Sequence, residues 1–216
     1  MRWIDSSVTA VGEIRPKELI LKVEEATRTC YRSEDMIGEG SAEKLIRNCI
    51  KRGHESTIEH ASITFGVICS RAISHEIVRH RMASYSQEST RYCAYNKGKF
   101  NGELKFIKPW WINTPGYDVA VSAIDIATRT AEEEYMRMLE AGFAPDVARD
   151  VLPNCLATKI VVTMNMREIR HFLRLRLSNK AHPDIQIIAR KLLNLLVENE
   201  LSIFVEDIIE EYGIQS

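Results

Sequence analysis

Apolar and polar positions along the chain repeat with two different periods, and these periods predict helices and strands in one protein. Apolar residues three or four positions apart predict helices, the clearest of them at 119–141. Alternating β-branched stretches predict strands at 61–69 and 103–108, and a β-branched run predicts a buried strand at 157–164. Further helices are predicted at 16–30, 41–53 (capped by Ser41), 71–82, 146–151, 167–177 and 183–211, the last as one helix or two.

The order of these elements indicates the fold class. Strands are scattered among groups of helices, without the regular alternation of a doubly wound sheet. We therefore predict an α+β fold, with a small, mostly antiparallel sheet packed by long helices, and no Rossmann fold. No internal repeat or linker divides the chain, so we expect a single domain spanning residues 1–216.

Composition narrows the class of protein further. The 29 basic and 30 acidic residues give a net charge of -1, so no global attraction to nucleic acid or to a membrane surface is expected. The five cysteines are widely spaced and form no CxxC pair, which indicates reduced thiols in a cytoplasmic protein. No stretch reaches the ~18 apolar residues of a membrane helix, and the first residues do not resemble a signal peptide.

One stretch, 74–95, concentrates polar chemistry: it holds three Arg, two His, four Ser and three Tyr. On the predicted helix 71–82, Arg71, His75 and Arg79 follow at i+4 and would form a polar column. A second basic group follows within 165–176. Guanidinium groups form paired, charge-assisted hydrogen bonds with phosphate and with the carbonyl edge of a pyrimidine or flavin. The two groups predict a site for an anionic heterocycle or nucleotide, although cations are also favoured at helix C-termini for purely structural reasons.

Other site chemistries fit the sequence less well. His54 and His60 are six positions apart, and His75 and His80 are five apart, so neither pair has the i+4 spacing of a zinc-binding helix, and no metal is expected. The chain also contains no GxGxxG or GxxxxGK[ST] phosphate loop and no GxSxG nucleophile elbow. A nucleotide would therefore be bound by side chains.

The basic stretch resembles the signature of the flavin-dependent thymidylate synthases, which is Arg-His-Arg, seven residues, then Ser. Here this is 79–81 followed by Ser89, and the extension Ser-Tyr-Ser-Gln-x-Ser-x-Arg-Tyr is present at 84–92. Further agreement lies at 53–56, 59–60, 147–149, 152–153, 165–167 and 173–176. The resemblance covers roughly residues 15 to 205.

This resemblance implies a homotetramer of α+β subunits that bind FAD at subunit interfaces, with active sites shared between subunits. The implied reaction converts dUMP to dTMP, with methylenetetrahydrofolate as the one-carbon donor and NADPH as the reductant through the flavin. Because flavin chemistry replaces a cysteine nucleophile in such enzymes, none of the five cysteines is expected to be catalytic.

The resemblance also implies roles for individual residues. Those expected to hold the flavin are Ser56, Arg79, His80, Arg81, Gln87, Asn165, Arg167 and His171. Those expected to bind dUMP are Glu76, Arg79, Gln87, Glu88, Ser89, Thr90, Arg91, Arg149 and Arg176.

Three residues, Arg176, Ser89 and His54, are expected at the reacting centre. Arg176 would lie at the uracil edge and stabilise negative charge that develops on the pyrimidine. His54 would lie near the flavin and the folate. Ser89 has the position of a nucleophile, but a serine needs an activating base and none is evident, so we expect it to bind substrate.

Two positions depart from the family pattern, and one alternative function remains. Glu76 stands where some members have Gln, and His171 stands where some have Asn.

The alternative function is a non-catalytic module for RNA or nucleotides, in which Tyr85, Tyr92 and Tyr95 would stack on bases. The near-neutral charge and the lack of RNP, KH or zinc-knuckle patterns disfavour it.

Overall fold

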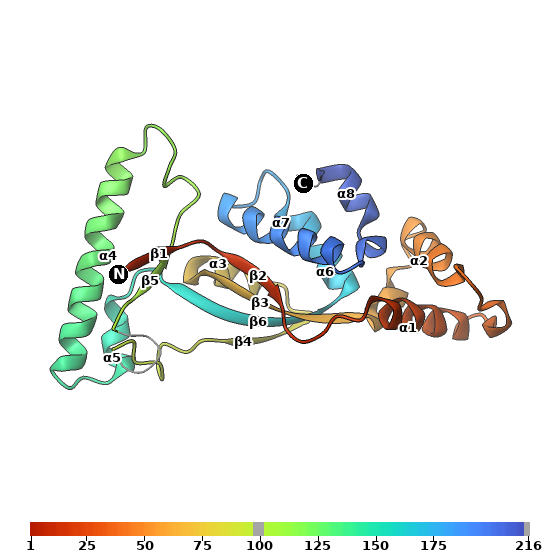
Figure 1. Ribbon diagram of the computed structural model, residues 1–216, viewed down its shortest axis with the longest axis horizontal. Coiled ribbons are helices and arrows are strands. Elements are labelled where there is room, and N and C mark those ends of the chain that lie inside the picture. The colour runs from red at the N-terminus through yellow and green to blue at the C-terminus, as the bar shows by residue number, and fades with distance from the viewer. Residues whose placement is uncertain (97–101, 214–216) are drawn as a thin grey trace. The chain divides into compact units, whose positions relative to one another are not determined.

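The computed structural model describes residues 1–96 and 102–213, and Figure 1 shows its helices and strands. The helices are Pro16–Thr29 (α1), Ser41–Lys51 (α2), Arg71–Ile77 (α3), Asp118–Glu140 (α4), Pro145–Ala148 (α5), Met166–Arg176 (α6), Pro183–Glu198 (α7) and Glu206–Tyr212 (α8). The strands are Arg2–Ile4 (β1), Ser7–Ala10 (β2), Ser62–Ser70 (β3), Ala83–Gln87 (β4), Lys105–Ile107 (β5) and Ala157–Asn165 (β6). Short 3₁₀ helices cover Glu34–Met36, Glu55–His60, Arg149–Val151 and Ser202–Phe204.

The strands form two sheets. Four strands form a small antiparallel sheet in the order β2-β3-β6-β4, and β1 pairs with β5 in parallel. The predicted α+β fold class is therefore confirmed. Strand β4 is not among the strands that the sequence predicts. Its residues alternate between half-buried and exposed and none is buried, so a polar sequence suffices and no apolar pattern marks the strand.

Contacts along the chain divide it into two compact units, which we describe separately. The first unit comprises Met1–Ser7, Val67–Val78 and Ser86–Ile160, and the second comprises Val8–Gly66, Arg79–Tyr85 and Val161–Ser216. The expected single domain over residues 1–216 stays a prediction.

The first unit is built around the long helix α4. Tyr135 of α4 is fully buried in an apolar cluster with Phe106 of β5 and Leu156. On the same helix, the Glu132 carboxylate accepts the backbone N–H of Leu104 at 2.7 Å and lies 2.6 Å from the N-terminal ammonium group. Both interactions connect α4 to the beginnings of β1 and β5. The predicted strand at 103–108 and helix at 119–141 are confirmed with slightly different ends.

The second unit contains α1, α2, α6, α7 and α8. Figure 1 shows α6 and α7 packed side by side, and the apolar positions of α7 are buried along most of its length. The predicted stretch at 183–211 divides into α7 and α8. In the described part of the chain, no helix has both the length and the apolar character needed to cross a bilayer.

Two local predictions are wrong. Helix α3 ends at Ile77 rather than near 82, so the column that began with Arg71 and His75 does not continue along a helix to Arg79. Consecutive β-branched residues at 77 and 78 have low helix propensity, which favours an end there.

The predicted cap of α2 is the second error. Gly40, with a φ of 69°, occupies the N-cap position, and Ser41 is the first helical residue. The hydroxyl of Ser41 instead donates to the Glu24 carboxylate at 2.6 Å and accepts the Gly38 N–H at 2.9 Å. Glycine is well suited here, because a left-handed backbone is unfavourable for residues with a Cβ.

Candidate functional site

A cavity of about 500 Å³ lies beside α6 in the second unit, and we call it the α6 cavity. Its lining includes Asn165, Arg167 and His171, three residues that the sequence predicts to surround a flavin. Met82, Glu168, Arg174 and two glutamates of the 3₁₀ helix Glu55–His60 complete it. The volume falls within the range of about 300–1,000 Å³ that is typical of small-molecule sites.

The N-terminus of α6 gives this cavity an anion-binding character. Asn165 is the N-cap residue, and its side-chain oxygen accepts the backbone N–H of Glu168 at 2.9 Å. Arg167 lies in the first turn. Unpaired N–H groups and the helix dipole favour negative charge at such an end, and an arginine adds a full positive charge. The arrangement suits a phosphate or another anionic group.

The cations around the α6 cavity are paired with carboxylates. Arg167 lies 2.5 Å from Glu59, and Arg174 lies 2.8 Å from Asp207 and 3.3 Å from Glu55. Arg167 and Glu59 keep 53% and 39% of their side-chain surface exposed. Exposed pairs of this kind stabilise proteins by only about 0–1 kcal/mol. Arg167 can therefore exchange Glu59 for a ligand phosphate at little cost.

Arg170, between these residues in sequence, has a structural role. Its side chain is fully buried and binds Asp207 at 2.7 and 2.9 Å, the Phe204 carbonyl at 2.6 Å and Glu55 at 3.0 Å. Burial alone would raise the pKa of the Asp207 carboxyl, but the hydrogen bonds and charges of Arg170 and Arg174 outweigh it and lower that pKa. The second basic group is thus divided between the cavity and the core.

His80 is the most deeply buried member of the Arg-His-Arg signature, with 4% of its surface exposed. Its Nε2 lies 3.1 Å from Nε of Arg176, and its Nδ1 lies 3.4 Å from a carboxylate oxygen of Glu168. The Tyr85 hydroxyl donates to the His80 carbonyl at 2.5 Å, and the Phe172 ring packs edge-on, with ring centroids 4.8 Å apart.

Burial, together with the nearby charges of Arg176 and His171, lowers the pKa of His80 to about 4. The imidazole is therefore neutral at pH 7. Because Nε of Arg176 can only donate, Nε2 of His80 must accept, and the imidazole proton lies on Nδ1, facing Glu168. Burial also raises the pKa of the Glu168 carboxyl.

Among the described residues, His80, Glu168 and His171 form a group that could be considered for a metal ion, with ligand atoms within 4.8 Å of one another. Ligands of a tetrahedral zinc ion lie about 3.3 Å apart, given metal–nitrogen distances of about 2.0–2.1 Å. In addition, the Arg176 guanidinium holds Nε2 of His80. The arrangement fits a hydrogen-bonded cluster better than a metal site.

A second cavity of about 220 Å³ lies in the first unit. Thr90 and Arg149, both predicted to bind dUMP, line it together with Arg71, Asp150 and Asn154. One terminal nitrogen of Arg71 is buried and has no hydrogen-bond partner in the described part of the chain. A buried N–H without a partner is unfavourable, so this cavity suits an anion such as a phosphate.

The remaining predicted dUMP residues of this unit differ in what their side chains contact. Gln87 donates to Ser74 at 2.9 Å and to Thr158 at 3.2 Å, and Glu88 accepts the Tyr95 hydroxyl at 2.6 Å. These two side chains are thus held by the protein itself.

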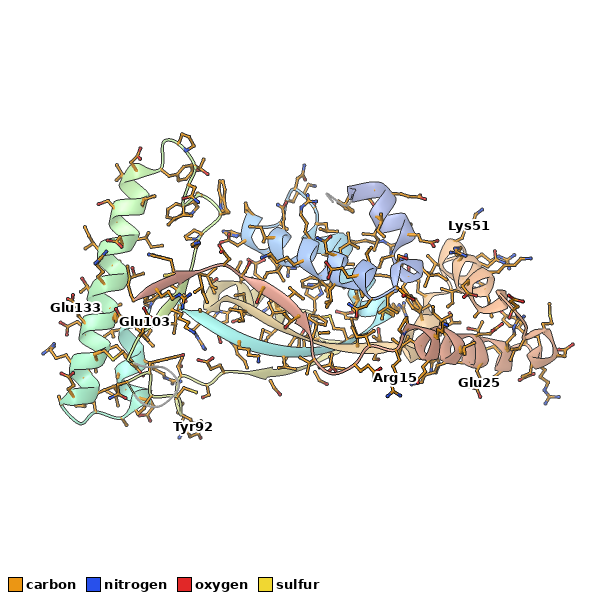
Figure 2. All side chains as sticks on the ribbon, in the orientation of Figure 1. Arg15, Glu25, Lys51, Tyr92, Glu103 and Glu133 are labelled. Carbon is orange, nitrogen blue, oxygen red and sulfur yellow. The ribbon has the colours of Figure 1, made fainter. Side chains whose placement is uncertain are left out.

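Ser89 and Arg91 lie next along the chain. The Ser89 hydroxyl accepts the backbone N–H of Arg91, and the Arg91 guanidinium lies 5.3 Å from the centre of the Tyr92 ring. Tyr92 is 76% exposed and extends away from the ribbon in Figure 2, whereas Tyr95 is 5% exposed. Because Tyr95 is buried and Tyr85 is bonded to the His80 carbonyl, the three-tyrosine stacking surface of the alternative binding module is not formed.

Several predicted site residues lie outside both linings. In the second unit, His54, Ser56, Arg79 and Arg81 are exposed and do not line the α6 cavity as the structure describes it. In the first unit, Glu76 is half-buried in α3. The structure therefore brings only part of the predicted site residues into the two cavities. The roles of these five residues outside them stay predictions.

Glu168 and Arg71 belong to these linings but are not among the predicted ligands. The sequence held a signal for Glu168, because Asn165 followed three residues later by a glutamate is the pattern of a capping box at a helix N-terminus. For Arg71 the sequence indicates only a place in a polar column. Its orphaned nitrogen depends on the tertiary structure.

Comparison with known proteins identifies the class. A family model described as thymidylate synthase complementing protein matches residues 18–199. The chain is 38% identical to the flavin-dependent thymidylate synthase of Thermococcus onnurineus, over 77% of this chain and 66% of that protein. It is 35% identical to that of Geobacter sulfurreducens, over 79% of this chain and 74% of that protein. The match thus spans about two thirds to three quarters of these relatives.

Two solved structures share the fold. Thymidylate synthase X from Helicobacter pylori, crystallised with FAD and dUMP, matches with a TM-score of 0.74 and 25% identity over 93% of this chain and 98% of that one. The UMP/dUMP methylase PolB from Streptomyces cacaoi, bound to 5-Br dUMP, matches with a TM-score of 0.76 and 26% identity over all of both chains.

The chain therefore belongs to the family of flavin-dependent thymidylate synthases, which are methyltransferases. The resemblance drawn from the signature at 79–89 is confirmed.

Proposed function

We propose that this chain binds FAD and converts dUMP to dTMP, with methylenetetrahydrofolate as the one-carbon donor and NADPH as the reductant. The observation that carries the proposal is the α6 cavity, which brings Asn165, Arg167 and His171 together at a helix N-terminus. The Helicobacter pylori neighbour, crystallised with FAD and dUMP, supports both ligands. When bound, the flavin would supply hydride transfer.

For the flavin, the chain offers side chains suited to a dinucleotide without a Rossmann loop. Arg167 and the first turn of α6 would bind anionic oxygens, and His171 would lie along the same wall. Arg79, Arg81 and Ser56 are exposed and would add donors from the signature and from the 3₁₀ helix Glu55–His60.

For dUMP, the cavity lined by Arg71, Thr90 and Arg149 would hold the phosphate. Ser89 and Arg91 would add donors beside it. Arg176 would lie at the uracil edge, where a fixed cation stabilises negative charge that develops on the pyrimidine. None of these roles requires a nucleophile from the protein.

We further propose a homotetramer with active sites shared between subunits, located in the cytoplasm. All five cysteines are free thiols, which fits a reducing compartment. Light scattering coupled to size-exclusion chromatography would measure the mass. A mass of about one chain at micromolar concentration would contradict the tetramer.

The test of function begins with the visible absorption spectrum of the purified protein. We expect oxidised-flavin bands, which bleach when NADPH is added anaerobically. Product analysis with methylenetetrahydrofolate should then detect dTMP from dUMP. A protein that stays colourless after incubation with FAD, or makes no dTMP, would refute the proposal. UMP should be offered in parallel, because the structural neighbour PolB is described as a methylase of both nucleotides.

A further inference from the structure

The signature histidine, His80, is placed unlike a ligand-binding side chain. Its ring is enclosed, with Phe172 4.8 Å and His171 5.6 Å away between ring centroids, and only 4% of the residue is exposed. A flavin could reach little of this ring. Its polar contacts are instead directed at two other side chains, Arg176 and Glu168.

The contact with Arg176 fixes a long and flexible side chain. Nε of Arg176 donates to Nε2 of His80 at 3.1 Å. A guanidinium is planar, so a hydrogen bond at Nε sets the direction of its two terminal nitrogens. Arg176 is the last residue of α6, and a bond that orders its side chain in the free protein reduces the cost of ordering it when substrate binds.

The contact with Glu168 orients the histidine in turn. Nδ1 of His80 lies 3.4 Å from Glu168, and the geometry is too poor to count as a formed hydrogen bond. Such contacts at enzyme sites are often long in the free protein and shorten when substrate binds. Glu168 is itself held, since its backbone N–H is bonded to the Asn165 side chain in the first turn of α6.

We propose that His80 and Glu168 are positioning residues for Arg176: Glu168 orients the imidazole of His80, and the imidazole holds the guanidinium of Arg176 at the uracil edge of dUMP. The inference rests on the proposed function, because the role of Arg176 at the uracil is part of it. Glu168 and Arg176 lie on α6, and His80 lies between them in this series of contacts. A cation that is positioned before the substrate arrives stabilises developing charge most effectively.

The test is a double-mutant cycle on dUMP binding and turnover, with His80→Phe, Arg176→Ala and the double variant. Phenylalanine fills the same buried space but cannot accept from Nε. Losing one hydrogen bond to a charged group should raise the Kd for dUMP, or lower kcat/KM, by about 10- to 100-fold. In the Arg176→Ala background, His80→Phe should change either value less than about twofold, because the residue acts through Arg176.

Two further variants separate positioning from structure. His80→Gln retains an acceptor near the position of Nε2, so it should recover most of the loss. Phe172→Leu disturbs the packing of the same ring without touching the hydrogen bond, and its effect should multiply with that of Arg176→Ala. If His80→Phe does not fold, Glu168→Ala replaces it in the same cycle, with a smaller effect that also vanishes without Arg176.

Three outcomes would overturn the inference. The first is independent effects of His80→Phe and Arg176→Ala. The second is loss of bound FAD in His80→Phe with unchanged dUMP affinity, which would make His80 a flavin residue. The third is no dUMP binding by the wild-type protein in calorimetry, which would overturn the proposed function as well. If the wild-type protein binds dUMP and forms dTMP but the effects of the two mutations are independent, the inference about His80 fails and the proposed function stands.

Discussion

Arg170 provides the sharpest test of how α6 is held in the second unit. Its guanidinium is fully buried and binds two carboxylates, Glu55 and Asp207, and the carbonyl of Phe204. These partners belong to the 3₁₀ helix Glu55–His60, to α8 and to the segment just before α8. Replacing Arg170 with methionine would fill most of the volume. It would leave the Phe204 carbonyl without this donor, and Glu55 and Asp207 would keep only their contacts with the more exposed Arg174.

The size of the effect follows from the burial of each partner. Removing one member of a buried ion pair destabilises proteins by about 3–5 kcal/mol. The Asp207 side chain is 45% exposed and regains water, so its share must be reduced, whereas Glu55 is only 17% exposed. We therefore expect Arg170→Met to lower the free energy of unfolding by about 3 kcal/mol. For a chain of this length, that loss lowers Tm by about 6–12 °C.

The matched control is Arg47→Met. Arg47 also binds a carboxylate of α8 with two nitrogens, but Arg47 and its partner Glu206 are 55% and 41% exposed. The expected loss there is below about 1 kcal/mol. Urea unfolding followed by circular dichroism, at equal protein concentration for all variants, measures both. Losses that agree within about 1 kcal/mol would refute the argument from burial.

The stability difference between the wild-type protein and Arg170→Met should also depend on pH. The pKa of Asp207 is lowered in the folded protein from its ordinary value of 3.8, by Arg170 and Arg174 against the opposing effect of burial. A lowered carboxyl pKa stabilises the fold above the unfolded value and loses that contribution as the pH falls through the folded value. The difference in stability between wild type and Arg170→Met should therefore be constant near neutral pH and shrink below about pH 4.

Three further predictions concern the first unit and the thiols. Arg149→Gln should weaken dUMP binding, measured by calorimetry, by about 10-fold or more, while the flavin content, measured by absorbance, stays unchanged. Equal losses of dUMP and flavin would contradict the assignment of this cavity to the phosphate. Tyr95→Phe removes the 2.6 Å hydrogen bond to Glu88 and should destabilise the protein by about 1 kcal/mol in thermal unfolding. An unchanged stability would contradict a stabilising role for this bond. In labelling with a thiol reagent at pH 8, exposed Cys30 should react quickly and Cys69 only on unfolding, because burial raises the pKa of Cys69 to about 12. Peptide mass analysis that finds fast labelling at Cys69 in the folded protein would contradict this order.

The sequence predicted most helices and three strands, because these elements have apolar positions at a regular period. Helix α4 and strand β6 were placed to within a few residues for this reason. Strand β4 escaped because it is polar, and the end of α3 was missed because the basic residues that follow it also fit a helical spacing. The signature at 79–89 identified the family without any structural information, since its residue types and spacing are specific.

By itself, therefore, the sequence determined the fold class, the family and the chemical types of the site residues, because local periodicity and motif spacing are written along the chain. Only the tertiary structure decided how similar residues divide their roles. Arg167, Arg170 and Arg176 lie on one helix, yet the first lines a cavity, the second is buried among carboxylates, and the third is bonded to a histidine 96 positions earlier. Burial and the partners brought from distant segments set those roles, and neither can be read from residue type or spacing.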